Sequence, residues 1–249
     1  MTKDTINKVF QKAFQSNIWK IEMDTEQHQL AIETRDTDTT IPTFYAIDFK
    51  GTALMHPLIM EEKEWTLDGI QNGFIVLKCV GEHTPIQEGV QVRRISDGQN
   101  TYFSREHILV DTFAHCIIVR HRNIASGQLW KIALDTGQSE PFTESETPAT
   151  VHTVNYPIPY KDTPAFFENT PFERPLWLSK VENNYLWCYH QVTENGFDLI
   201  LTKSDLNQIL DQQVILSGME KMIPQPYFQL GNQIFFMTYN KRKIIAFLV

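Results

Sequence analysis

The feature that most constrains the fold is a hairpin pattern that occurs five times along the chain. Each copy has an apolar strand, a tight polar turn and a second, more continuously apolar strand. The second strands centre near Ala31, Val76, Ile118, Trp187 and Phe235, at intervals of 45, 42, 69 and 48 residues. Strand units that repeat roughly every 40–50 residues are typical of the blades of a β-propeller.

Further strand patterns follow the hairpins. In the third copy, Trp130, Ile132 and Leu134 alternate with Lys131 and Ala133, which is the two-residue period of a strand with one buried face. The second strand of each hairpin is almost continuously apolar, as expected for a strand buried on both faces. The sequence therefore predicts an all-β fold: a single β-propeller of five four-stranded blades.

In the first copy we expect the outer strand at Ala53–Met55. The long interval between the third and fourth copies indicates an insertion at about residues 138–175. Seven of the 12 prolines lie in this stretch, and proline cannot donate a hydrogen bond to a β-ladder. We interpret residues 1–249 as one propeller domain that carries this insertion.

The fifth copy has only three strand patterns before the sequence stops, and an incomplete blade would leave open strand edges. The N-terminal segment 5–14 can supply the missing strand and close the ring, which is the interpretation that we favour. The alternative is a helix that covers the ring edge, because five apolar residues have helical spacing: Ile6, Val9, Phe10, Ala13 and Phe14.

Charge and composition narrow the classes of partner. The net charge is −8, and an acidic surface repels nucleic-acid backbones, so we expect no nucleic-acid partner. No secretory signal or run of membrane-spanning length is visible, so we expect a cytoplasmic protein with no membrane partner. The three cysteines, Cys79, Cys116 and Cys188, fall in apolar strands, so we predict that they are buried core residues. We expect no cofactor and no metal.

Three segments point to a family. The runs Ile18–Asp24, Leu30–Arg35 and Gly127–Gly137 resemble an uncharacterised family of Bacteroidetes proteins of about 250 residues. The resemblance extends over the whole chain and carries no catalytic motif. It implies a bacterial, propeller-like protein whose domain has no assigned function.

The loops suggest where binding residues lie. In a four-stranded blade, the connections that are long here meet at one end of the ring, and binding sites are usually built on such loops. The insertion carries Tyr156, Tyr160, Phe166 and Phe167, which are suited to anchoring a partner. The alternative is that these aromatic residues fold back and form a small core of their own.

Two histidines, His83 and His121, lie near the long loops of adjacent blades and could converge at the same end. No metal-binding spacing accompanies them. We therefore predict a non-enzymatic binding or scaffold module whose partner is a protein or a small ligand. The alternative is a carbohydrate-active or other hydrolase with two carboxylates in the central funnel, so enzymatic activity stays open.

Overall fold

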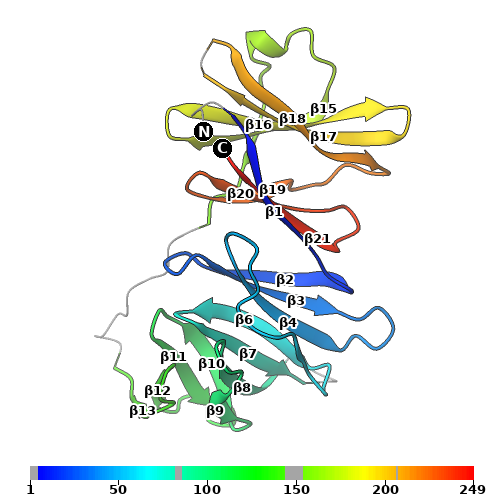
Figure 1. The fold of residues 1–249 in the computed structure, drawn as a ribbon. Coiled ribbons are helices and arrows are strands. Elements are labelled where there is room, and N and C mark those ends of the chain that lie inside the picture. The colour runs from blue at the N-terminus through cyan, green and yellow to red at the C-terminus, as the bar shows by residue number, and fades with distance from the viewer. Residues whose placement is uncertain (1–4, 82–85, 144–153, 206) are drawn as a thin grey trace. The chain divides into compact units, whose positions relative to one another are not determined.

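Each of the five predicted hairpins is present as an antiparallel pair of strands (Figure 1). The computed structural model describes residues 5–81, 86–143, 154–205 and 207–249. These residues form 21 strands in five antiparallel sheets and one short 3-10 helix, η1 (Ala165–Phe167). The all-β class predicted from the sequence is therefore confirmed.

The chain divides into two compact units, and each is described by itself. Unit I is Phe14–His152, and unit II combines Met1–Ala13 with Thr153–Val249. Three of the sheets belong to unit I and two to unit II. Among the described residues, no helix is long and apolar enough to cross a membrane. The single-domain interpretation of residues 1–249 stays a prediction.

Unit I contains three four-stranded sheets in which each strand pairs with the next one along the chain. Sheet 1 consists of β2 (Asn17–Asp24), β3 (Gln29–Arg35), β4 (Pro42–Asp48) and β5 (Leu58–Ile59). Sheet 2 consists of β6 (Trp65–Gln71), β7 (Phe74–Val80), β8 (Gln87–Arg94) and β9 (Asn100–Ser104). Sheet 3 consists of β10 (His107–Thr112), β11 (Cys116–His121), β12 (Leu129–Ala133) and β13 (Ser139–Pro141).

The outer strand of sheet 1 differs from the prediction. At Ala53–Met55 the chain makes a single bridge, between Ala53 and Ile47, and the outer strand is β5. Pro57 lies between the two pieces. Because proline lacks an N–H, it cannot continue the ladder, and the pairing with β4 resumes only after it.

Alternation along β7 explains how three sheets share two cores. Ile75 and Leu77 pack into a cluster with side chains of sheet 1, including Phe44. Phe74 and Val76 pack into a second cluster with side chains of sheet 3. Successive residues of a strand point to opposite faces, so the nearly continuous apolar run of this strand fills both cores, as the sequence predicted.

Unit II contains the two remaining sheets. Sheet 4 has five strands in the order β14 (Ile158–Tyr160), β15 (Glu173–Val181), β16 (Asn184–Thr193), β17 (Gly196–Ser204) and β18 (Ile209–Met219). Sheet 5 has the order β1 (Asn7–Ala13), β21 (Lys243–Leu248), β20 (Gln233–Met237) and β19 (Tyr227–Leu230). One apolar cluster contains buried residues of both sheets, among them Leu186 and Phe236.

The N-terminal segment is a strand and not the alternative helix. β1 pairs antiparallel with β21 and completes sheet 5. The Ile6 N–H donates to Asp211 Oδ2 at 2.7 Å, and the Phe10 ring lies 6.5 Å from that of Phe235. The missing fourth strand of the fifth hairpin copy is therefore supplied from the other end of the chain. Closure of a ring by this strand stays a prediction.

The proline-rich stretch at about 138–175 also supplies one edge strand to sheet 3 and one to sheet 4. Its first residues form β13, the outer strand of sheet 3, and β14 adds a fifth strand to sheet 4. Both are three residues long. Short strands next to prolines are typical of a sheet edge.

Candidate functional site

The four predicted aromatic residues of the insertion differ in exposure. Tyr156 is 57% exposed. Phe167 is only 1% exposed, with its ring 5.8 Å from that of Trp187. Tyr160 and Phe166 are partly buried, with rings 5.3 and 5.9 Å from the same indole.

These contacts make the insertion a cover for one face of sheet 4. Its side chains form a cluster with Leu176, Trp187, Tyr189 and Ile200. The Trp187 indole N–H donates to Ser204 Oγ at 2.8 Å, so the polar atom of this indole is satisfied. Three of the four aromatic residues thus have the packing expected of the fold-back alternative. A binding role for any of them stays a prediction.

The two predicted histidines are not brought together by the described part of the chain. His83 lies outside the described residues. His121 ends β11 and pairs in register with His107, whose ring centre is 6.1 Å away. Tyr102 Oη lies 2.7 Å from His107 Nδ1. Burial and the nearby His121 lower the pKa of His107, so its neutral form is favoured.

The described residues contain no group of three or more His, Cys, Asp or Glu side chains that could hold a metal ion. Unit I has one ion pair within β2 and another between β6 and β7. Lys20 Nζ lies 2.9 Å from Glu22 Oε1, and Lys78 Nζ lies 2.8 Å from Asp68 Oδ1. Burial is the main cause that raises the pKa of Glu22, and the negative charge of Asp68 adds to it.

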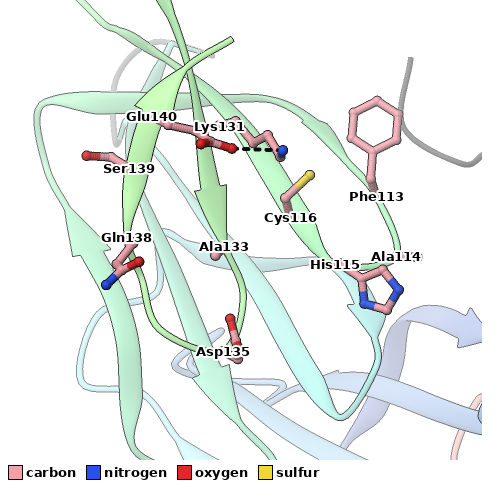
Figure 2. A pocket seen from close by; sticks show the side chains of 10 residues that line it. All are labelled: Phe113, Ala114, His115, Cys116, Lys131, Ala133, Asp135, Gln138, Ser139 and Glu140. Atoms are coloured by element: carbon pink, nitrogen blue, oxygen red, sulfur yellow. Dashed lines mark ion pairs between the residues drawn. The ribbon is translucent and has the colours of Figure 1, made fainter. Parts of the chain in front are cut away.

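A cavity of about 510 Å³ lies on sheet 3 (Figure 2). We call it the hollow. It has the volume of a site for a small organic ligand. Its described lining comes from the β10–β11 turn, the start of β11, β12, the β12–β13 turn and β13: Phe113, Ala114, His115, Cys116, Lys131, Ala133, Asp135, Gln138, Ser139 and Glu140.

Alternation along β12 creates the hollow. Ile132 and Leu134 belong to the core shared with sheet 2. Lys131 and Ala133 therefore point to the opposite face, where Ala133 pairs in register with Cys116. Two small side chains opposite each other leave space between longer neighbours, which makes an apolar floor.

Charged and polar groups surround this floor. Figure 2 shows the Lys131–Glu140 ion pair on one side of Cys116 and Ala133, and Asp135 on the turn beyond Ala133. Lys131 Nζ lies 2.8 Å from Glu140 Oε1, and the Glu140 side chain is 64% exposed. An exposed pair of this kind contributes about 0–1 kcal/mol.

A hydrogen bond fixes the chemical form of His115 at the rim. Asn72 Nδ2 lies 3.0 Å from His115 Nδ1. An amide nitrogen only donates, so Nδ1 must accept, and the neutral ring carries its proton on Nε2. His115 therefore offers one N–H donor and no positive charge in this arrangement.

Cys116 lies in the floor with 4% of its surface exposed. Burial raises the pKa of its thiol, and the nearby Lys131 opposes that effect only in part. The thiolate is the reactive form of cysteine. The thiol therefore contributes to the shape and apolar character of the floor rather than acting as a nucleophile.

The sequence prediction missed the hollow. It recognised the alternation of residues 130–134 but drew conclusions only from the apolar residues of that pattern, which indicate the buried face. The remaining positions, Lys131, Ala133 and Asp135, place a small residue between two charged ones on one face. Within sheet 3, the hollow lies at the end that carries the β10–β11 and β12–β13 turns, opposite the β11–β12 loop. The sequence prediction had placed the site at the end with the long loops.

Comparison with known proteins identifies no family. No family model matches the chain, and no curated protein matches it. The resemblance to an uncharacterised Bacteroidetes family therefore stays a prediction.

Solved structures show a distant likeness. A putative TolB from Agrobacterium tumefaciens is 10% identical over 77% of this chain and 64% of its own, with a TM-score of 0.33. The β-propeller domain of the Trilobed protease from Pyrococcus furiosus is 8% identical over 93% of this chain and 65% of its own, with a TM-score of 0.35. An oligogalacturonate lyase in complex with manganese is 10% identical over 98% of this chain and 92% of its own, with a TM-score of 0.34.

The chain spans less than two thirds of the length of the first two of these structures. Identities of 8–10% and TM-scores below 0.5 assign neither an activity nor a ligand to it.

Proposed function

We propose that this chain is a non-enzymatic binding module, built as a five-bladed β-propeller, and that the hollow on sheet 3 holds a small ligand. The observation that carries the proposal is the hollow itself: about 510 Å³ of space with an apolar floor and charged groups at its rim. Ligand sites typically combine an apolar lining with a few polar groups that orient the ligand.

The five hairpin repeats and their antiparallel sheets support the propeller part of the proposal. The proposed function, a non-enzymatic binding module, is the one predicted from the sequence. The proposed site differs, because it lies at the turns of sheet 3 and not at the long-loop end. The burial of Phe167 and the partial burial of Tyr160 and Phe166 favour this change, because packed side chains are not available to a partner.

The test is to block the hollow with a larger side chain and to measure whether a bound ligand still co-purifies with the protein. We would purify the protein gently from its own cells and measure its mass by native mass spectrometry. The wild type is expected to show an excess of a few hundred daltons. Ala133→Phe, which places a ring over the floor, should lose that excess.

Ala125→Phe is the matched control, because Ala125 is exposed and does not line the hollow. It should keep the bound mass. A wild type without any excess mass would contradict the proposal, and so would an Ala133→Phe variant that keeps it. A mass increase equal to a whole protein, unaffected by Ala133→Phe, would favour the protein-scaffold form of the prediction.

One observation favours the alternative hydrolase. Glu22 has a raised pKa and interacts with a second carboxylate, Asp68, and pairs of acids with different protonation perform glycoside hydrolysis. Each carboxylate also forms an ion pair with a lysine, which makes binding the better-supported function. Hydrolysis of 4-nitrophenyl glycosides that is lost in both Glu22→Gln and Asp68→Asn would favour the enzyme instead.

A further inference from the structure

The charges of the hollow do not cancel. Lys131 and Glu140 neutralise each other at 2.8 Å, and His115 is neutral while its Nδ1 accepts from Asn72. Among the described residues of the lining, the carboxylate of Asp135 is then the remaining charge, and these residues together have a net charge of about −1.

The neighbouring guanidinium does not remove that charge. Arg94 Nη1 forms an ion pair with Asp97 Oδ2 at 2.9 Å, and Arg94 Nη2 donates to the backbone carbonyl of Asp135 at 3.3 Å. The arginine thus contacts the main chain of the turn while its charge is balanced by Asp97. The Asp135 side chain is exposed at the rim, where it can accept from a ligand.

One other feature favours a positive ligand, and two favour an apolar body. Phe113 places an aromatic ring at the edge of the hollow, where it can pack against an apolar body. The whole chain has a net charge of −8, which raises the local concentration of cations and lowers that of anions. The floor between these groups is made of alanines and Cys116, which suit an apolar body.

We propose that the ligand of the hollow is a small organic cation: a primary amine with an apolar body, its ammonium near Asp135 and its body over Ala133 and Cys116. This inference rests on the proposed function, and it adds the chemical class of the ligand. An ammonium at Asp135 leaves the Lys131–Glu140 pair in place, whereas a carboxylate ligand has to compete with Glu140 for Lys131.

Three probes with one carbon skeleton test the charge preference: phenethylamine, 2-phenylethanol and phenylacetate. We would titrate each into isotope-labelled full-length protein at low ionic strength and follow backbone amide shifts by NMR. The amine is expected to bind most tightly, with the largest shifts at residues that line the hollow, such as Ala133 and Gln138.

Charge variants separate this preference from unspecific attraction to an acidic protein. Asp135→Asn should weaken amine binding by roughly two- to fivefold, the range of one exposed charge contact. Lys131→Met should strengthen it, because Glu140 is then left without that lysine. Asp111→Asn removes a carboxylate from β10 outside the hollow and should have no effect on the amine.

Failure of this inference differs from failure of the proposed function. If 2-phenylethanol or phenylacetate binds as tightly as the amine, or if none of the three probes binds, the cation assignment is overturned. It is also overturned if Asp135→Asn and Asp111→Asn have equal effects. A native mass excess that disappears in Ala133→Phe would still support a ligand in the hollow in each of these cases. Absence of that excess would overturn the proposed function as well.

Discussion

At the scale of single residues, Glu33 forms buried interactions between two sheets of unit I. Its side chain is fully buried, and its oxygens accept from Arg35 Nε at 2.7 Å, Thr66 Oγ1 at 2.7 Å and the Leu67 N–H at 2.8 Å. Arg35 in turn donates to the carbonyl of Trp65. One buried acid thus connects β3 of sheet 1 to β6 of sheet 2.

We expect Glu33→Gln to lower the free energy of unfolding by about 3 kcal/mol, because it leaves a partly buried guanidinium without its counter-charge. Chemical denaturation measures the change. Asp97→Asn breaks an exposed pair with Arg94 and should cost less than about 1 kcal/mol. Equal losses for the two variants would show that burial does not decide the strength of these pairs.

The thiol of Cys188 gives a pH prediction. Its side chain is fully buried, and burial raises the pKa of this thiol well above its ordinary value. The folded protein therefore holds its proton at a pH where the unfolded chain has released it, so stability is present below the ordinary thiol pKa of about 8.5 and is lost as pH rises above it.

Unfolding free energies measured from about pH 7.5 to 10 should fall with rising pH, and Cys188→Ala should make that fall less steep. A decline with the same slope in the variant would assign the effect to other groups. Tyr227, whose pKa is also raised by burial, ionises in the unfolded chain only near pH 10.

The contact between Asn72 and His115 makes a prediction about the tautomer of the imidazole. Asn72 has a backbone φ of 50°, a conformation that glycine adopts without strain. Asn72→Gly therefore removes the amide contact with His115 and keeps the backbone. Nitrogen NMR of the imidazole should show mainly the Nε2–H form in the wild type and a mixture in the variant. An unchanged tautomer ratio would mean that another contact fixes the ring.

At the scale of structural elements, the cover of sheet 4 makes a clear prediction. Phe167→Ala should cost about 3–5 kcal/mol of stability, since it removes a fully buried ring that packs against Trp187 and Tyr189. Tyr156→Ala removes an exposed ring from the same insertion and should change stability by less than about 0.5 kcal/mol. Thermal denaturation distinguishes the two, and similar melting temperatures would contradict the packing of Phe167 against sheet 4.

The elements also show how far the sequence could be read. The five hairpins were predictable because their second strands, such as β7, are apolar on both faces and bounded by turn residues. The outer strand of sheet 1 was misplaced, because two-residue strands carry too little pattern and Pro57 interrupts the ladder. The helical spacing in β1 has a physical origin: the register shifts between Lys8 and Phe10. One extra residue in a two-residue alternation imitates a period near 3.6.

The hollow was beyond prediction for a different reason. Alternation along β12 indicates which residues share a face, but a cavity depends on what stands opposite. Only the register that pairs Ala133 with Cys116 brings two small side chains together. In a hairpin the register depends on the geometry of the connection, here residues 122–128, and the apolar pattern does not specify it.

At the scale of the whole molecule, sheet 5 depends on both ends of the described chain. Removal of residues 1–13 deletes β1, and with it the contacts of Ile6 with Asp211 and of Phe10 with Phe235. We expect the truncated protein to be cleaved by protease within residues 207–249 about tenfold faster than the full chain, because the open edge of β21 lowers local stability.

A synthetic peptide of residues 5–14, added in excess, should restore resistance by strand addition, and a scrambled peptide should not. Mass spectrometry of the first fragments locates the cuts. Equal cleavage rates with and without residues 1–13 would show that β1 contributes little to sheet 5.

The pairing of β1 with β21 also sets an order of events during synthesis. The partner of β1 is Lys243–Leu248, so about 230 residues must leave the ribosome after β1 before that partner exists. At 5–20 residues per second this delay lasts roughly 10–50 s. During this delay, residues 5–14, which include the apolar Ile6 and Phe10, have no strand to pair with. A chaperone that binds extended segments would therefore protect the nascent chain most in this interval.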